Sequence, residues 1–259
     1  MNSDHPSTAI DRTRLIERSP VIARLLLPSA MAIFLLLSLA YWWLENVPHE
    51  IFGTALFALL AWHIGVNRRW FKNLFEGRYD RRRAVVAALH VLLIVNMLIL
   101  LLTSIVISKS LFSALPIPDS IYLREVHWFS AYWVMMIVGI HLGLHWTRVM
   151  TLTRSTLGLR PDSAGRTLAL RIAAVLLTGF GVWSFSVLGI WSKLTFTYSL
   201  DVWNFKTSVA PFFGHWVGVV TLPATVTHYL MVGWRQHRTN RQTNRKQGAA
   251  MIKGMGNIL

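Results

Sequence analysis

Cysteine is absent from this chain of 259 residues. Its absence excludes disulfides, thiolate-ligated iron–sulfur clusters and covalently attached haem, which needs a C-x-x-C-H sequence. Acidic residues are also scarce, with 11 Asp and Glu against 26 Lys and Arg. No Asp or Glu lies well inside a long apolar segment. This argues against a proton relay, because such relays usually combine carboxylates with histidines.

Apolar residues dominate what is present. The chain is 54% hydrophobic and only 14% charged, which is too apolar for an ordinary soluble domain. About 20 mostly apolar residues are needed to cross a bilayer core. The sequence therefore predicts an all-α membrane protein with six transmembrane helices, at residues 24–44, 50–67, 84–108, 126–147, 168–191 and 211–234. No segment outside them is long enough for a flavin or nucleotide domain, so we expect any such partner on a separate chain.

The basic residues lie in the N-terminus, in the loops 68–83 and 148–171, and in the C-terminal tail. By the positive-inside rule both termini are cytoplasmic, and we expect a multi-pass protein of a bacterial inner membrane. The net charge of +15 does not indicate nucleic-acid binding, because no face interleaves basic residues with exposed aromatics. Membrane lipid is the expected partner of these charges.

Histidines are the unusual residues in the apolar segments. The second, fourth and sixth predicted helices run toward the cytoplasm, and each carries two histidines, one near either end: His49 and His63, His127 and His141, and His215 and His228. This arrangement predicts a two-helix unit repeated three times.

The first two pairs share a spacing of 14 residues, which on an α-helix advances about 1400° and rises about 21 Å. Both histidines of a pair therefore lie on one helix face. Because the two helices run in the same direction, His49 lies level with His127, and His63 level with His141. The sequence predicts two stacked bis-imidazole sites, each of which suits the iron of a non-covalent b-type haem in a helical bundle. Packing histidines, a metal site or a relay are the alternatives.

Several further residues are candidates for these sites. Arg124 lies three residues before His127, and Arg68 and Arg69 follow the second helix, so all three are candidate contacts of haem propionates. His145 lies 18 residues after His127, and the other helix has no partner at that depth. We interpret His145 as a residue that supports a haem ligand without binding the iron itself, as a quinone contact or as an interfacial histidine.

The third pair is weaker. The 13 residues between His215 and His228 leave the two side chains roughly 140° apart on a straight helix, although Pro223 between them can change the register. We treat both as low-ranking extra candidates for a quinone or partner site. His90, at the start of the third segment, is expected to have an interfacial role.

The sequence resembles the flavinylation-associated cytochromes, a membrane family formerly known only as a domain of unknown function. The resemblance covers residues 25–150. It rests on "HEIFGTALFALLAWHIGVNRRWFKNLFEGRY" (49–79), "LLTSIVISKSLF" (101–112) and "REVHWFSAYWVMMIVGIHLGLHW" (124–146). It implies a b-type haem protein that moves electrons across the membrane, often with an extracytoplasmic flavin-carrying partner.

Carried over by position, the family's histidines correspond to four residues of this chain, and its trailing H-x-x-x-H corresponds to a fifth: His49, His63, His127, His141 and His145. The chain departs from the family at Trp62, where a second histidine often stands, and in its added fifth and sixth helices.

These observations divide the chain into five parts. They are a basic N-terminus, a four-helix di-haem cytochrome b-like domain, a cytoplasmic loop, an additional helix pair and a basic, mobile tail, at residues 1–23, 24–150, 151–166, 167–234 and 235–259.

The expected function is that of a di-haem b-type cytochrome, the electron-transfer membrane subunit of an oxidoreductase system. It would pass electrons between the quinone pool or an inner-side donor and an extracytoplasmic redox protein. The alternative is a six-helix haem subunit of the ferric-reductase type, fed by a separate flavoprotein. A transporter or sensor with histidines as pH switches is the non-redox alternative.

Overall fold

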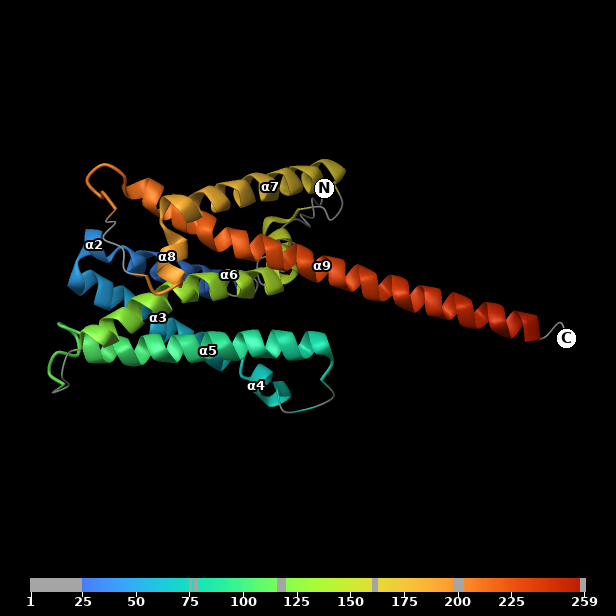
Figure 1. The fold of residues 1–259 in the computed structure, drawn as a ribbon, viewed down its shortest axis with the longest axis horizontal. Coiled ribbons are helices and arrows are strands. Elements are labelled where there is room, and N and C mark those ends of the chain that lie inside the picture. The colour runs from blue at the N-terminus through green and yellow to red at the C-terminus, as the bar shows by residue number, and fades with distance from the viewer. Residues whose placement is uncertain are drawn as a thin grey trace, which may run out of the picture.

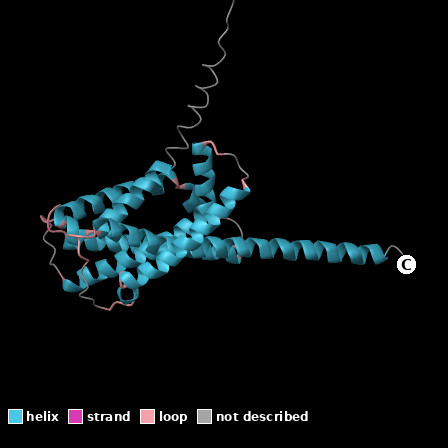
Figure 2. Cartoon of the chain, turned by 90° about the horizontal axis from the view of Figure 1, so that it is seen from above, coloured by secondary structure: helices cyan, strands magenta, loops and turns pink. Residues whose placement is uncertain are grey.

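The computed structural model describes residues 25–74, 76, 79–115, 120–159, 163–197 and 203–256. Every regular element in these ranges is a helix (Figures 1 and 2). The predicted N-terminal part, residues 1–23, lies outside the described residues.

The described helices follow one another without a strand between them. They are Leu25–Leu39, α2 (Tyr41–Leu44), α3 (Asn46–Val66), α4 (Arg69–Leu74), α5 (Arg81–Ile107), α6 (Ile121–Leu157), α7 (Ala164–Val187), α8 (Ile190–Leu194) and α9 (Val209–Gly256). Five helices are long and apolar enough to cross a membrane: α3, α5, α6, α7 and the part of α9 from Val209 to Asn244. The chain is an all-α protein with the features of a multi-pass membrane protein.

The first predicted segment, 24–44, is not one span in the described residues. Helix Leu25–Leu39 is shorter than the five candidate spans. It stops at Ala40, whose ψ of 37° departs from helical geometry, and α2 follows. Ala40 is fully buried in an apolar cluster, so packing fixes the break. Five spans, rather than six, are therefore supported.

The long helices alternate in direction. α3, α6 and α9 begin at one end of the bundle, where Asn46 Nδ2 donates to Ser110 Oγ (2.7 Å). We call this the Ser110 end. α5 and α7 begin at the opposite end, where Arg238 of α9 pairs with Asp80 (2.8 Å); we call this the Asp80 end. α6 packs on α5 and on α9, and α7 packs on the other side of α9 (Figure 1).

Glycines let α9 approach its two neighbours closely. A Cβ at Gly139 of α6 would lie 2.6 Å from the carbonyl oxygen of Val220, and one at Gly143 would lie 2.3 Å from that of Ala224. On the α7 side, a Cβ at Gly181 would lie 2.7 Å from the carbonyl oxygen of Gly218. Small residues commonly allow such close contact between membrane helices. The glycines of α6 therefore serve α9 packing.

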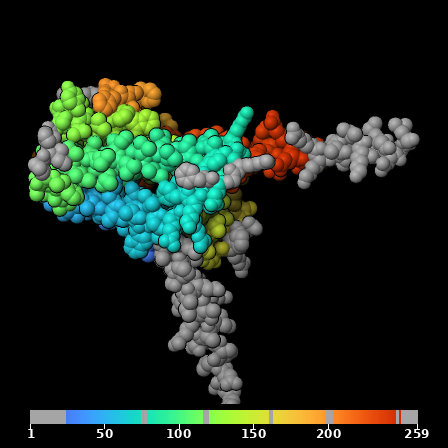
Figure 3. Space-filling view, turned by 90° about the horizontal axis from the view of Figure 1, so that it is seen from below, coloured from blue at the N-terminus to red at the C-terminus, as the bar shows by residue number. Residues whose placement is uncertain are grey.

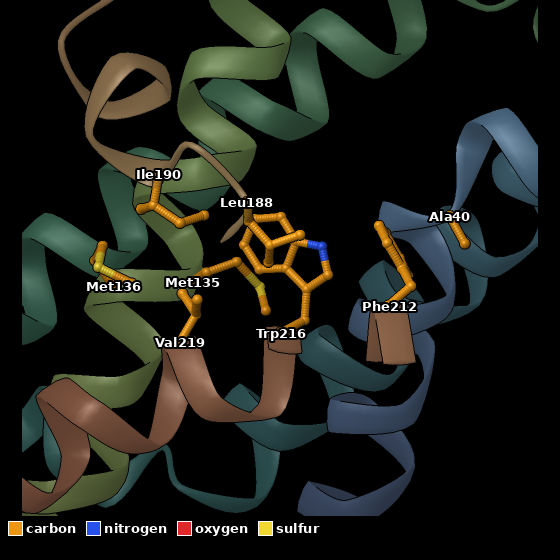
Figure 4. Packing of buried hydrophobic residues seen from close by; sticks show 8 residues of the cluster. All are labelled: Ala40, Met135, Met136, Leu188, Ile190, Phe212, Trp216 and Val219. Atoms are coloured by element: carbon orange, nitrogen blue, oxygen red, sulfur yellow. The ribbon is translucent and has the colours of Figure 1, made fainter. Parts of the chain in front are cut away.

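The largest buried cluster joins α6, α9 and the turn between α7 and α8 near the Ser110 end. Figure 4 shows its members: Ala40, Met135, Met136, Leu188, Ile190, Phe212, Trp216 and Val219. Gly189 adopts a left-handed conformation (φ 56°) that turns the chain into α8. A second cluster, of Met97, Leu100 and Val134, joins α5 and α6 in the middle of the bundle.

Residues 235–256 of the predicted tail are helical, because α9 continues through them and projects beyond the bundle (Figure 1). In Figure 3 the red residues of α9 stand beyond the end of the other helices. The extension is rich in Arg, Gln, Lys and Ala, which favour helix, and no proline interrupts it. The helix also runs through Pro223 without ending.

Candidate functional site

His49 of α3 and His127 of α6 face each other near the Ser110 end. Their ring centroids lie 6.2 Å apart and the ring planes meet at 73°. His127 is buried and His49 is half-buried. The structure therefore brings together the first predicted pair, which we call the first tier.

A backbone carbonyl of helix Leu25–Leu39 fixes the His49 ring. His49 Nδ1 lies 2.8 Å from the carbonyl oxygen of Ser38. A carbonyl oxygen only accepts, so Nδ1 carries the proton and Nε2 keeps its lone pair. Ser38 lies in the last turn of helix Leu25–Leu39, where carbonyls lose their partners within the helix. The break at Ala40 thus supplies the acceptor that orients His49.

A hydroxyl fixes His127 in the corresponding way. Thr103 Oγ1 of α5 lies 3.1 Å from His127 Nδ1 and donates its own proton to the carbonyl oxygen of Ile99 (2.8 Å). The hydroxyl oxygen therefore accepts from His127 Nδ1–H, which leaves Nε2 unprotonated. Such outer partners orient metal-bound imidazoles in proteins and set their tautomer.

The separation of the two first-tier rings is close to that of two imidazoles that bind one metal ion. A metal bound to an imidazole nitrogen at about 2 Å lies about 3 Å from the ring centroid, so two rings on opposite sides of it would stand about 6 Å apart. The observed separation is 6.2 Å. Two lone pairs on neighbouring helices, each ring fixed through its other nitrogen, are the donor set that a b-type haem requires.

Glu50, next to His49, clamps α3 to the end of α5. Its carboxylate accepts hydrogen bonds from the backbone amides of Lys109 (2.8 Å) and Leu111 (2.8 Å). It also accepts from Ser108 Oγ (2.8 Å) and Asn46 Nδ2 (2.9 Å). The clamp sets the height of α3 against α5 and α6, and so holds the two first-tier rings level. Sequence reasoning missed this role, although the adjacent His-Glu pair in a span with few acids was a signal.

An apolar layer separates the two ends of the histidine face. Phe57 and Leu60 of α3 pack with Leu93 and Met97 of α5 against Val134 of α6. Phe57 and Leu60 lie between His49 and His63 in sequence, and Val134 lies between His127 and His141. Apolar side chains therefore stand between the two histidine groups.

A second group of histidines, the second tier, lies toward the Asp80 end. The ring of His141 lies 4.7 Å from that of His145 and 5.0 Å from that of His90, centroid to centroid. His90 Nδ1 bonds to the carbonyl oxygen of Val86 (2.6 Å), so its Nε2 is unprotonated, and this Nε2 lies 3.2 Å from Nε2 of His145. One ligand atom from each of the three rings lies within 4.8 Å of the others.

His63, the predicted partner of His141, is half-buried and lies within Coulombic range of His141 and His145. Among the described residues it has no ring contact with another histidine. The facing geometry of the first tier is therefore not repeated here, and the pairing of His63 with His141 stays a prediction.

His90 was expected to be interfacial, yet it belongs to the second tier, with His145. The signal was present in the sequence. On α5, His90 lies 13 residues before Thr103, and on the antiparallel α6, His141 lies 14 residues after His127. Because Thr103 and His127 are in contact, nearly equal distances along the two helices bring His90 level with His141.

The third pair has one half of the first-tier arrangement. His215 Nδ1 lies 2.9 Å from Ser184 Oγ of the preceding helix, which donates to the carbonyl oxygen of Phe180. His215 stacks on the Phe180 ring and is flanked by Trp183 and Trp203. No histidine faces it among the described residues. His49, His127 and His215 are each anchored through Nδ1 by an oxygen of an earlier, longer helix: Leu25–Leu39, α5 and α7 respectively. This shared arrangement favours the predicted repeat of helix pairs.

The remaining candidates are His228 and the three arginines Arg124, Arg68 and Arg69. His228 is half-buried and makes its ring contact with the neighbouring Tyr229. Arg124 is half-buried in the first turn of α6, on the side of the first tier. Arg68 and Arg69 are exposed beyond the end of α3. The assignment of the three arginines as contacts of haem propionates stays a prediction.

Comparisons of the chain with protein families, with curated proteins and with solved structures each find no match.

Proposed function

We propose that this chain is a transmembrane b-type cytochrome that carries electrons across the membrane between two haems. The observation that supports it best is the first tier. There His49 and His127 face each other at 6.2 Å, and each Nδ1 is held by an oxygen of the preceding helix.

Each residue of the first tier has a defined task in this proposal. His49 and His127 hold the iron through Nε2, and Ser38 and Thr103 keep the two rings in the required tautomer. Glu50 holds α3 at the height where its ring meets that of α6. A b-type haem bound here supplies a one-electron carrier at the Ser110 end of the bundle.

The second haem belongs to the Asp80 end, with His63 and His141 as its ligands. The structure does not fit this pair as directly, because the rings of His90 and His145 surround His141 instead. We derive no step through that haem. In the proposal, His90 and His145 support His141 or contact a quinone, and the apolar layer separates the two sites.

The resemblance to flavinylation-associated cytochromes supports the proposed partners. They are the quinone pool or an inner-side donor on the cytoplasmic face of a bacterial inner membrane, and a flavin-bearing redox protein on the opposite face. The Asp80 end, from which the basic extension of α9 projects, lies on the cytoplasmic side in this proposal, and the N-terminus shares that side only if helix Leu25–Leu39 also crosses the membrane. Counted with that short helix, the pairs lie on the second and fourth predicted segments, which favours the proposal over a ferric-reductase type, which carries its pairs on the third and fifth.

One observation favours a second candidate function, the binding of a transition-metal ion at the second tier. His90 Nε2 and His145 Nε2 lie 3.2 Å apart. Ligand atoms at about 2 Å from a tetrahedral metal ion stand about 3.3 Å from each other. In this case the chain would hold one haem and one metal ion, because His141 can bind the second haem or the metal ion but not both.

Haem stoichiometry tests the proposal. A pyridine haemochromogen assay on the purified full chain is expected to give two b-type haems, and His49→Ala or His127→Ala to give one. His237→Ala, an exposed histidine of α9, is the control and retains both. The absence of a Soret band, or an unchanged count in both first-tier variants, would contradict the proposal.

The same preparation separates the second candidate. The metal site would be established by a preparation that holds one haem and one Co²⁺ with a d–d spectrum. His127→Ala should then lose the haem, and His90→Ala should lose the Co²⁺. Two haems with no Co²⁺ binding would reject it.

A further inference from the structure

A cavity of about 390 Å³ opens at the Asp80 end, beside the second tier. It lies among the start of α5, the second half of α6 and the middle of α9. His145 of the second tier forms part of its wall, together with two threonine hydroxyls, Thr147 and Thr151. The cavity is therefore walled by hydrogen-bonding groups as well as by apolar side chains.

Three arginines, one from each helix, line this cavity: Arg82 of α5, Arg148 of α6 and Arg235 of α9. The lining contains no acidic side chain. Arg82 is half-buried, and Arg148 and Arg235 are exposed at the mouth of the cavity. Their three like charges repel each other, and an anion in the cavity relieves this repulsion.

The nearest acid is already engaged. Asp80 lies within Coulombic range of Arg82. However, its carboxylate accepts from the Arg83 backbone amide (2.9 Å) and pairs with Arg238 Nη1 (2.8 Å). Arg82 Nε is shielded from solvent and has no acceptor among the described residues. The cavity thus keeps positive charge and an unused donor.

We propose that this cavity binds a phosphate-bearing anion, with Arg82, Arg148 and Arg235 as the binding residues. Arginine presents paired N–H donors that match the oxygens of a phosphate, and the threonine hydroxyls add neutral donors. A phospholipid headgroup and a soluble phosphate compound share this chemistry. The site does not depend on the proposed haems.

The first experiment measures anion binding by the full chain in detergent. Native mass spectrometry titrations with dioleoylphosphatidylglycerol and with dioleoylphosphatidylcholine give apparent Kd values. We expect one tight site for the anionic lipid only. Arg148→Gln and Arg235→Gln each weaken it by about tenfold or more, because each removes charged hydrogen bonds.

Matched variants control for the loss of surface charge. Arg81→Gln of α5 and Arg241→Gln of α9 remove arginines that are exposed like Arg148 and Arg235 but lie outside the cavity lining, and they leave the Kd unchanged within about twofold. Inorganic phosphate that competes with the lipid at constant ionic strength assigns the site to soluble phosphate. A lack of competition assigns it to the lipid headgroup.

Equal affinity for the two lipids together with no binding of phosphate would overturn the proposal, as would an equal effect of cavity and control variants. A fall in haem content in Arg148→Gln with unchanged lipid binding would also overturn it, and would assign these arginines to haem propionates. Because lipid binding is measured without a haem signal, this failure is separate from a failure of the proposed function.

Discussion

The His127 ring is joined to Thr103 on the neighbouring antiparallel helix, with 3.1 Å between Nδ1 and Oγ1. The threonine proton is already donated to Ile99, so the imidazole must be the donor. A ligand imidazole that donates from Nδ1 is more basic and stabilises the oxidised metal. This relationship makes Thr103 a positioning residue for the first tier.

Replacing Thr103 with valine is expected to raise the reduction potential of one haem by roughly tens of millivolts, because the ligand becomes less basic. The haem count stays unchanged. Redox titration of the α band measures the shift. Thr178→Val is the matched control, since the Thr178 hydroxyl bonds to its own helix at Ala174 and to no histidine among the described residues. Equal potentials in the Thr103 variant and the parent would reject the role.

Removal of the Glu50 carboxylate is expected to loosen α3. Glu50→Ala leaves the backbone amides of Lys109 and Leu111 without their acceptor, and bonds to charged groups contribute about 1.5–3 kcal/mol each. We expect a lower thermal unfolding midpoint in detergent and reduced haem retention. Glu76→Ala, an exposed site, serves as the comparison. If the two variants unfold at the same temperature, Glu50 does not act as a clamp.

The glycines facing α9 are expected to tolerate no side chain. Gly143→Ala and Gly181→Ala each place a Cβ within 3 Å of backbone on α9, so the helices must separate, at a cost of about 1–3 kcal/mol. Gly179 lies two residues before Gly181, and a Cβ there would have no atom within 4 Å. In Gly179→Ala the alanine therefore favours the helix by about 1 kcal/mol without a clash. Thermal unfolding should therefore fall for the first two variants and hold or rise for the third.

Asp80 gives the structure a defined acid dependence at the Asp80 end. The Arg83 backbone amide, and then Arg238, hold the pKa of this carboxyl below its usual range. A lowered pKa in the folded state means that the stabilisation is complete above the unfolded value of about 3.9 and is lost as the pH falls through the folded value.

The difference in unfolding midpoint between the parent and Asp80→Asn is therefore expected to be constant at pH 5–7 and to shrink as the pH falls below the unfolded pKa of about 3.9 and through the lower folded value. Melting curves across this range measure it. A difference that persists unchanged in acid would show that the charge of Asp80 has no part in the contact with Arg238.

The helices were largely predictable, because apolar runs and helical periodicity are local properties. Four predicted segments correspond to α3, α5, α6 and α7, with ends shifted by up to five residues except at the C-terminal end of α6, which lies ten residues further along, and the fifth candidate span begins at Val209. The first segment was wrong as a single span, since hydropathy does not register a backbone break. The helix over residues 235–256 was not predicted, because this polar segment has no apolar periodicity.

The site was predictable only in part. The 14-residue spacing predicted that His49 would meet His127, and the structure places their rings 6.2 Å apart with the planes at 73°. The same reasoning did not find His90, Glu50 or the arginine cavity. Each of these depends on which residues of separate helices come level with one another.

The sequence by itself determined an all-helical membrane chain without thiols, with histidines in phase along two helix faces. Helix period and hydrophobic length are set within one segment, so they can be read from it. Only the tertiary structure decided that Ser38 and Thr103 orient the first tier, that His90 joins His141 and His145, and that three arginines share one cavity. The rotation and height of each helix come from its packing against the others, which glycine contacts and the Glu50 clamp fix across the bundle.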